Sequence, residues 1–173
     1  MGAINHDLTK VKALIFDVDG VLSVDTVPIT ATGEALRTIN IKDGYALQLA
    51  LKSNLCVAVI TGGNSPIVKA VFEEAGLDYV YMASSKKIND LEDFIQKTGI
   101  KADEILYMGD DIPDYEVLSC VGVPTCPKDA AAEIKAVCKY ISPKKGGKGC
   151  VRDVVEQVLK AQGYWMQGNA FGW

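Results

Sequence analysis

Residues 12–20 read KALIFDVDG, and this stretch decides the fold of the chain. An apolar run from Ala13 to Phe16 is followed at once by Asp17, and then by Asp19 and a glycine. A short apolar run that ends in a polar turn is typical of a buried strand in a parallel sheet. In such sheets ligands bind beyond the carboxyl ends of the strands, so the two aspartates stand where chemistry is expected. Taken alone, the motif fits a solvated Asp-x-Asp-Gly turn equally well.

Outward from this stretch, short apolar runs alternate with segments of helical period along the chain. We predict strands over Lys12–Asp17, Leu55–Thr61, Asp78–Tyr81, Glu104–Gly109, Gly122–Thr125 and Lys139–Ile141. We predict helices over Asp43–Ser53, Ser65–Ala75, Lys86–Thr98, Pro113–Cys120, Ala130–Cys138 and Val151–Gln162. This alternation predicts an α/β fold, a doubly wound parallel sheet, and the length of 173 residues suits a single domain over residues 1–173.

Two stretches break the alternation. The segment Val21–Ile41 is rich in β-branched residues around a Thr-Gly-Glu turn, and it predicts a β-hairpin that projects from the loop after the first strand. The tail, residues 163–173, contains three glycines beside several aromatic residues. It is too rich in glycine for a stable helix and too aromatic for an inert linker.

The composition narrows the class of partner. The formal net charge of −4 argues against a nucleic-acid or anionic-membrane surface, both of which need an extended positive field. The five cysteines are scattered without a C-x-x-C pair, which is typical of reduced thiols in the cytoplasm. The run Ala13–Phe16 is too short for a membrane span or a signal-peptide core. We therefore expect a cytoplasmic protein with a small-molecule partner.

Later strand ends carry groups that complement the two aspartates. Thr61 and Gly62 follow the second predicted strand and offer a hydroxyl and a backbone N–H to an anion. A lysine pair, residues 86–87, opens the third helix. The fourth strand ends in Gly-Asp-Asp, residues 109–111, with Asp114 three residues further on. Carboxylates, N–H donors and a fixed positive charge at one sheet edge are equipment for phosphoryl transfer with a hard divalent cation.

In this order, the motifs Asp-x-Asp-Gly, Thr-Gly, Lys and Gly-Asp-Asp-x-x-Asp resemble those of the haloacid dehalogenase superfamily. More narrowly, Asn40–Tyr45 (NIKDGY), Thr61-Gly62 and Gly146–Arg152 (GGKGCVR) resemble the 3-deoxy-D-manno-octulosonate 8-phosphate phosphatases. The resemblance runs from about Lys10 to about Gln162. It implies a Rossmann-like core and a Mg²⁺-dependent phosphatase that acts in lipopolysaccharide precursor synthesis.

The resemblance also implies a role for each motif residue. Asp17 would attack phosphorus and form an aspartyl-phosphate, which splits one slow displacement into two easier ones. Asp19 would protonate the leaving alkoxide and then activate the hydrolytic water. Thr61 and the Gly62 N–H would bind the transferring phosphoryl oxygens, while Lys87 neutralises charge on the nucleophile and the phosphate.

The same resemblance implies the metal ligands. Mg²⁺ would be held by the Asp17 carboxylate, the Asp19 backbone carbonyl and Asp110. Asp111 and Asp114 are open to two interpretations. Either could orient the lysine or a water beside the metal, or simply cap the helix that begins nearby.

Substrate contacts are predicted in two places. Asp43, Gly44 and Tyr45 stand where the resembled family contacts substrate, although Asp43 is equally placed to cap the helix that it begins. The basic stretch Pro143–Arg152, with Arg152 at its end, could hold an anion such as the sugar carboxylate or could be a solvated loop.

No cap domain fits between the motifs. The predicted hairpin and one helix fill the gap from Asp17 to Thr61, and one helix and one strand fill that from Thr61 to Lys87. An open site needs another surface to exclude water. The resemblance implies a homotetramer in which a neighbouring subunit supplies this surface through the hairpin, Val24–Ile41, and the tail, residues 163–173. The alternative is a tail that packs on its own subunit.

One departure from the family pattern leaves the substrate open. Many octulosonate phosphate phosphatases have an arginine directly after Thr-Gly, where this chain has Gly63. A phosphatase for a nine-carbon 2-keto-3-deoxy sugar acid 9-phosphate is the nearest alternative. A phosphomutase is disfavoured because it must exclude water, and a non-enzymatic binding module because it would not need both Asp17 and Asp19.

Overall fold

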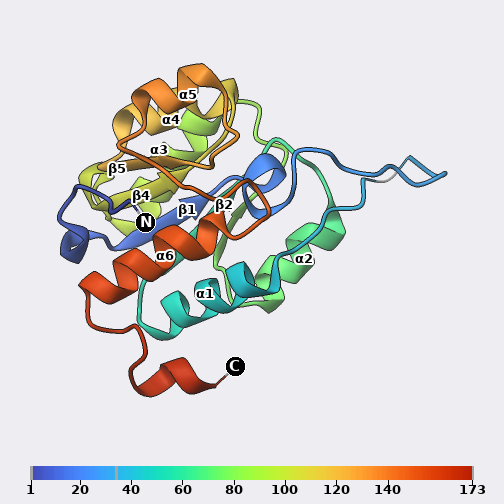
Figure 1. Ribbon diagram of the computed structural model, residues 1–173. Coiled ribbons are helices and arrows are strands. Elements are labelled where there is room, and N and C mark those ends of the chain that lie inside the picture. The colour runs from blue at the N-terminus through green and yellow to red at the C-terminus, as the bar shows by residue number, and fades with distance from the viewer. Residues whose placement is uncertain (1, 34, 173) are drawn as a thin grey trace.

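The computed structural model describes residues 2–33 and 35–172, and its centre is one six-stranded parallel sheet (Figure 1). The strands are β1 (Ala13–Phe16), β2 (Cys56–Ile60), β3 (Tyr79–Tyr81), β4 (Ile105–Met108), β5 (Val123–Cys126) and β6 (Tyr140–Ile141). The main helices are α1 (Ile41–Lys52), α2 (Pro66–Glu74), α3 (Lys87–Thr98), α4 (Tyr115–Cys120), α5 (Ala132–Val137) and α6 (Cys150–Ala161). The predicted doubly wound α/β fold is confirmed, and each predicted strand and helix is present within about two residues of its expected ends.

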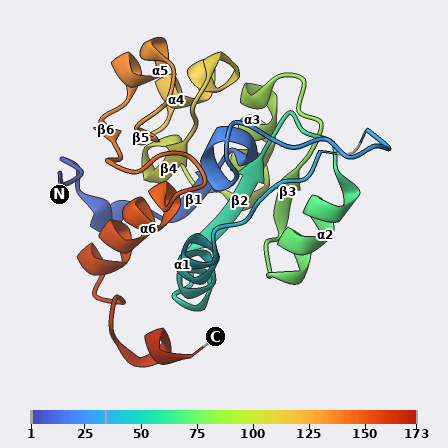
Figure 2. The ribbon, with the colours of Figure 1, turned by 45° about the vertical axis from the view of Figure 1, so that its right-hand side comes forward.

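Both faces of the sheet are covered, which explains why the strands are continuously apolar. In β1, Leu14 and Phe16 join one apolar cluster, whereas Ala13 and Ile15 join the other. Helices α1, α2 and α6 pack on the first face, and α3, α4 and α5 on the second (Figure 2). Because alternate side chains of a strand point to opposite faces, a strand covered on both sides is apolar at every position.

The strand order β3-β2-β1-β4-β5-β6 places the site. From β1 the chain winds outward through β2 to β3, returns to β4 on the other side of β1, and winds outward again. The carboxyl ends of β1 and β4 therefore border the point where the winding reverses, and ligands bind at such points in open α/β sheets. The Asp17 N–H donates to the Met108 carbonyl at 3.0 Å, which holds the two strand ends together.

The predicted hairpin projects from the domain as expected, but it is barely a β-structure. We call residues 24–40 the arm (Figure 1). Among its described residues, a single antiparallel bridge joins Ile29 to Ala35, around a turn in which Gly33 has φ +84°. The Leu36 N–H donates to the Pro28 carbonyl at 2.8 Å, but Pro28 lacks an N–H and cannot donate in return. Glu34 of the predicted turn lies outside the described residues.

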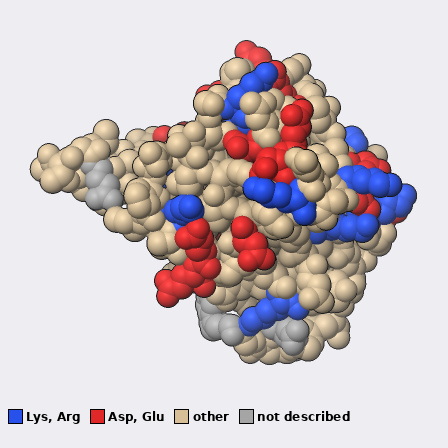
Figure 3. Space-filling model, turned by 180° about the vertical axis from the view of Figure 1, so that it is seen from behind, with Lys and Arg blue, Asp and Glu red and all other residues tan. Residues whose placement is uncertain are grey.

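The arm is apolar and exposed. Its face in Figure 3 carries few charged side chains, whereas acidic and basic groups are interspersed over the body. Ile29 is 72% exposed, Leu36 52% and Ile39 50%. Large apolar side chains in such a projection are typical of a surface that another molecule covers.

The tail packs on its own chain, as the alternative interpretation holds. The Trp165 ring meets the Tyr45 ring edge-on, with centroids 6.5 Å apart, and Ala170 is buried. The Tyr45 hydroxyl donates a hydrogen bond to the Ala170 carbonyl, so the tail is anchored to α1. As its glycine content predicted, the described part of the tail forms only one short 3₁₀ turn, Gly168–Phe171. Trp173 lies outside the described residues.

Asp43 links two helices, and its contact with substrate stays a prediction. It is fully buried, and one of its oxygens accepts a hydrogen bond from the Arg152 N–H at 2.6 Å, near the start of α6. The alternative prediction, that Asp43 caps α1, was wrong. Asn40 caps this helix, because its side chain accepts from the N–H groups of Lys42 and Asp43. The second carboxylate oxygen of Asp43 has no hydrogen-bond partner among the described residues.

Replacing Asp43 with asparagine is expected to remove part of the pH dependence of stability. Burial raises the pKa of Asp43 from 3.8 to about 6, although hydrogen bonds from the Arg152 and Gly149 backbones oppose the change. An acid whose pKa is raised on folding stabilises the fold fully only below its unfolded pKa, and this stability is lost as pH rises through the folded pKa. Between pH 4.5 and 7.5 the wild type should lose about 2 kcal/mol relative to Asp43→Asn. Urea unfolding at both pH values measures this, and parallel changes in the two proteins would contradict it.

Candidate active site

Asp17 lies where β1 ends and the chain turns sharply. The following residues, Val18–Leu22, form one irregular helical turn in which Gly20 has φ +80°. The Val18 N–H donates to Asp17 Oδ1 at 2.6 Å, and Lys87 Nζ lies 2.7 Å from Asp17 Oδ2. The turn thus holds a buried carboxylate at the open end of the sheet, with an ammonium group against it.

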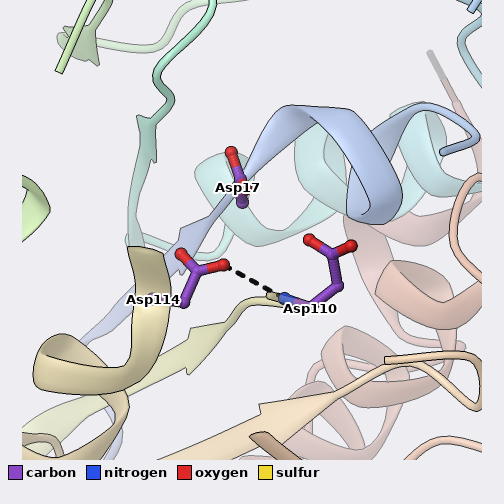
Figure 4. A group of neighbouring side chains, drawn as sticks. All are labelled: Asp17, Asp110 and Asp114. Carbon is purple, nitrogen blue, oxygen red and sulfur yellow. Dashed lines mark hydrogen bonds between the residues drawn. The ribbon is translucent and has the colours of Figure 1, made fainter. Parts of the chain in front are cut away.

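Lys87 is fixed by a buried network whose centre is Asp114. Lys87 Nζ donates to Asp114 Oδ1 at 2.7 Å, and the Tyr107 hydroxyl donates to the same oxygen at 2.6 Å. The N–H groups of Asp110 and Asp111 donate to Oδ2 at 3.1 and 3.4 Å, and Figure 4 shows the first of these contacts. All four donors therefore converge on one fully buried carboxylate.

This network decides between interpretations that the sequence left open. Asp114 orients the lysine rather than only beginning a helix, whereas Asp111 is exposed and forms no ion pair with Lys87 among the described residues. Lys86, the other candidate lysine, is exposed and lies 3.6 Å from Glu116 on the surface. A surface pair of this kind contributes little to stability.

Asp110 faces Asp17 with its carboxylate free. Oxygens of Asp17, Asp110 and Asp114 lie within 4.8 Å of one another (Figure 4). Among the described residues, none donates a hydrogen bond to the Asp110 carboxylate, while both Asp114 oxygens are occupied. A side-chain carbon at Gly20 would lie 2.0 Å from Asp110 Oδ2, so only glycine allows this approach.

The electrostatics of the cluster fit a divalent cation. Burial, reinforced by Asp114 and opposed by Lys87, raises the pKa of Asp17 to about 6. Burial, reinforced by Asp17 and Asp114, raises the pKa of Asp110 to about 7. A cation between the Asp17 and Asp110 oxygens would remove the cause of both shifts, because it offsets the lost solvation and the mutual repulsion. Oxygen ligands of this type suit Mg²⁺.

Thr61 and Gly62 complete the same pocket, which has a volume of about 500 Å³. The loop after β2 is tied to the loop before α3, because Ser84 N–H donates to the Thr61 carbonyl at 3.0 Å and Ala83 N–H to the Gly63 carbonyl at 2.9 Å. The pocket is also lined by the predicted residues Asp17, Asp19, Lys87, Asp110, Asp111 and Asp114. Strand ends far apart in sequence therefore meet in one place.

Asp19 is paired with an arginine from the arm. Nε and Nη2 of Arg37 donate to the two carboxylate oxygens of Asp19, each at 2.8 Å. The same Nη2 lies 2.9 Å from the position that a side-chain carbon would take at Gly63. The guanidinium thus lies against the glycine that stands where the resembled family often has an arginine.

Three other residues predicted to contact substrate, Gly44, Tyr45 and Arg152, do not line this pocket within one chain, and their contact with substrate stays a prediction. The Arg152 guanidinium stacks 4.3 Å from the Trp165 ring centre and 5.3 Å from that of Tyr45, and it pairs with Glu156. Tyr45 and Arg152 therefore anchor the tail. Gly44 lines an apolar groove beside α1 and α2.

The glycine-rich stretch before Arg152 supports the active-site turn. The Gly147 N–H donates to the Val21 carbonyl at 2.7 Å. A side-chain carbon at Gly146 would lie 1.9 Å from the Gly20 carbonyl oxygen, so these backbones approach as only glycine allows. The stretch thus buttresses the turn that carries Asp19.

Sequence reasoning missed two residues of the site, Arg37 and Tyr107. Each left a signal: Arg37 is the only basic residue between Lys12 and Lys42, and Tyr107 is a hydroxyl within an otherwise apolar strand. A buried hydroxyl needs a hydrogen-bond partner, but sequence does not say which. Burial and Asp114 raise the pKa of Tyr107 well above its usual value, so its hydroxyl stays a donor.

An aspartate directly after β1, a buried lysine and two neighbouring aspartates at the switch point are the arrangement expected of an aspartate-based, metal-assisted hydrolase. A family model described as haloacid dehalogenase-like hydrolase matches residues 64–152. The chain is 35% identical to the 3-deoxy-D-manno-octulosonate 8-phosphate phosphatase KdsC of Salmonella typhi, over 91% of this chain and 86% of that protein. It is also 35% identical to KdsC of Escherichia coli K12, over 89% of this chain and 82% of that protein. The chain belongs to the haloacid dehalogenase-like hydrolases, as its motifs predicted, and it is a phosphoric monoester hydrolase.

Solved structures agree with this placement. The 3-deoxy-D-manno-octulosonate 8-phosphate phosphatase of Moraxella catarrhalis, in complex with a magnesium ion, a phosphate ion and a KDO molecule, has a TM-score of 0.87 and 31% identity, and the match covers 91% of this chain and 90% of that one. The cobalt-bound phosphatase of Haemophilus influenzae has a TM-score of 0.90 and 27% identity, and the match covers 96% of this chain and 99% of that one.

Proposed function

We propose that this chain hydrolyses 3-deoxy-D-manno-octulosonate 8-phosphate to the free sugar acid and phosphate. The observation that supports this most is the meeting of Asp17, Asp110 and the Lys87–Asp114 pair around one pocket. The substrate comes from the relatives, whose names specify this eight-carbon ester. We also propose that the reaction takes place in the cytoplasm; the five cysteines are free thiols in the described chain, and free thiols are typical of a reducing compartment.

In the first step an Asp17 carboxylate oxygen bonds to phosphorus while the bond between phosphorus and the sugar oxygen breaks. Asp19 gives its proton to the leaving oxygen, so no free alkoxide forms. Thr61 and the Gly62 N–H bind the transferring oxygens, and Lys87 offsets their charge. Lys87 keeps the proton that this role requires, because Asp17 and Asp114 raise its pKa overall, although burial alone would lower it.

In the second step water attacks the phosphorus of the aspartyl-phosphate. The Asp19 carboxylate accepts a proton from this water, and the bond between Asp17 and phosphorus breaks to release inorganic phosphate. Asp17, the Asp19 backbone carbonyl and Asp110 would hold Mg²⁺, which supplies positive charge between the nucleophile and the phosphate when bound. Asp111 stays a candidate for orienting a water at the pocket edge.

Closure of the open pocket is proposed to come from a neighbouring subunit in a homo-oligomer, most simply a tetramer. Among the described residues no cap domain covers the pocket, and the exposed apolar arm projects beside it. The tail is bound to its own α1, so the arm is the better candidate for the closing surface. A solution mass of one 18.6 kDa chain would contradict this proposal. No helix within residues 2–33 and 35–172 is long and apolar enough to cross a membrane.

The substrate is tested by phosphate release from a panel of esters, each with Mg²⁺ or with chelator. The eight-carbon sugar acid 8-phosphate is expected to give the highest kcat/KM, and chelator is expected to lower the rate by at least about 10³-fold, because the nucleophile and the dianion would then repel each other. The panel includes a nine-carbon sugar acid 9-phosphate and a hexose 6-phosphate. A preference for the nine-carbon ester would overturn the substrate assignment alone, and no release from any ester would overturn the enzymatic proposal.

A further inference from the structure

The Arg37–Asp19 pair as it stands is incompatible with the role proposed for Asp19, and the inference drawn from it rests on that proposed function. Each oxygen of the carboxylate accepts an N–H of the guanidinium at 2.8 Å. A group that must give a proton to a leaving oxygen and then take one from water needs an oxygen directed at the substrate. The pair must therefore open during the reaction.

The guanidinium already lies beside the donors that would bind phosphate. It is 13% exposed and rests against Gly63, whose own N–H donates to Thr61 Oγ1 at 3.1 Å. To reach the space between these donors and Lys87, the guanidinium would have to move away from Asp19. The planar fork of an arginine matches a phosphate as well as it matches a carboxylate.

The charge of the pocket explains why arginine would change partner. Among the described residues that line it, six are aspartates and one is a cation, Lys87. An incoming phosphate ester adds up to two negative charges. Lys87 already forms ion pairs with Asp17 and Asp114. A second cation in contact with the phosphate would offset that charge.

We propose that Arg37 binds substrate by exchanging partners: it pairs with Asp19 as long as no ester is bound, and it moves to the phosphoryl oxygens when the ester enters. The exchange frees the Asp19 carboxylate, which can then take up from solvent the proton that it gives to the leaving oxygen. The exchange would also couple the position of the arm to phosphate binding, because Arg37 is an arm residue. The neighbouring Thr38 N–H donates a hydrogen bond to Ser23 Oγ at 3.2 Å.

The exchange is tested by calorimetric titration of inorganic phosphate into the full-length protein with Mg²⁺ present. Arg37→Ala is expected to weaken phosphate binding about tenfold, the worth of one charge-assisted contact. Arg37→Lys keeps the charge without the fork and should recover only part of this loss. Lys42→Ala, which removes an exposed charge at the base of the arm, is the matched control and should change the affinity less than about twofold.

A double-mutant cycle with Asp19→Asn separates exchange from simple charge. Asp19→Asn should tighten phosphate binding in the wild type by releasing the guanidinium, and it should tighten it less in the Arg37→Ala background. Equal tightening in both backgrounds, or phosphate affinity unchanged in Arg37→Ala, would overturn the exchange while leaving the phosphatase proposal intact. A wild type that binds no phosphate would overturn both.

Discussion

Asp17→Asn is expected to lower phosphate release by on the order of 10⁴-fold or more, the largest effect of any single change in this chain. An amide oxygen is a poor nucleophile, so no aspartyl-phosphate can form. The asparagine has nearly the same shape as the aspartate and keeps an oxygen toward the Val18 N–H. The measurement is single-turnover release from the eight-carbon ester, together with acid-quench trapping of labelled protein.

Stability separates this loss from misfolding. Burial raises the pKa of Asp17 to about 6, which means that its charged form is costly in the metal-free fold. A neutral asparagine removes that cost, so metal-free Asp17→Asn should unfold at a temperature equal to or above that of the wild type at pH 8. Turnover within about tenfold of the wild type, or labelled protein trapped in the variant, would show that another residue is the nucleophile.

Asp114→Asn is expected to lower both the stability and the rate by a large amount. Its two oxygens satisfy Lys87, Tyr107 and two backbone N–H groups, and an amide nitrogen in place of either oxygen would face donors. Removing one partner of a buried, hydrogen-bonded charge pair costs about 3 kcal/mol. Turnover should fall about 10²-fold, because Lys87 is no longer held against the phosphate site. Urea unfolding and kcat measure the two effects.

Two matched variants serve as references for the loss of stability in Asp114→Asn. Tyr107→Phe removes one buried donor and should cost about 1 kcal/mol with a small change in rate. Asp111→Asn alters an exposed carboxylate of the same segment and should change stability by less than about 0.5 kcal/mol. If Asp114→Asn were no more destabilising than Asp111→Asn, the four hydrogen bonds would not be what orders the lysine.

Much of the fold was predictable because it follows from local sequence patterns, the apolar runs of the strands and their alternation with helices. The run Ala13–Phe16 is apolar at each position, and the structure shows both faces of that strand covered. The motif residues Asp17, Thr61, Lys87 and Asp110 follow successive strands, and parallel strands end at one edge. Their meeting therefore follows from the alternation of strand and helix, whereas their chemical roles stay proposals.

Local patterns failed where a residue acts across the fold. Asp43 looked like a helix cap or a substrate ligand, yet it caps a helix more than 100 residues away in the chain. Arg152 is predicted to bind an anion, a role that stays a prediction, and sequence did not show that its guanidinium stacks on two aromatic rings. Both contacts join α6 to α1, and nothing in either segment alone indicates which helix will lie beside it.

The sequence by itself determined the parallel sheet and the edge of the sheet that carries the aspartates, because the period of each segment and the alternation of strands with helices are local patterns of the chain. The strand order came from the structure. Only the tertiary structure decided that Asp114 holds Lys87, that Tyr107 supports it, and that Arg37 reaches from the arm to Asp19. The physical reason is that hydrogen bonds and ion pairs act over about 3 Å, so their partners are known only when distant segments have been placed in space.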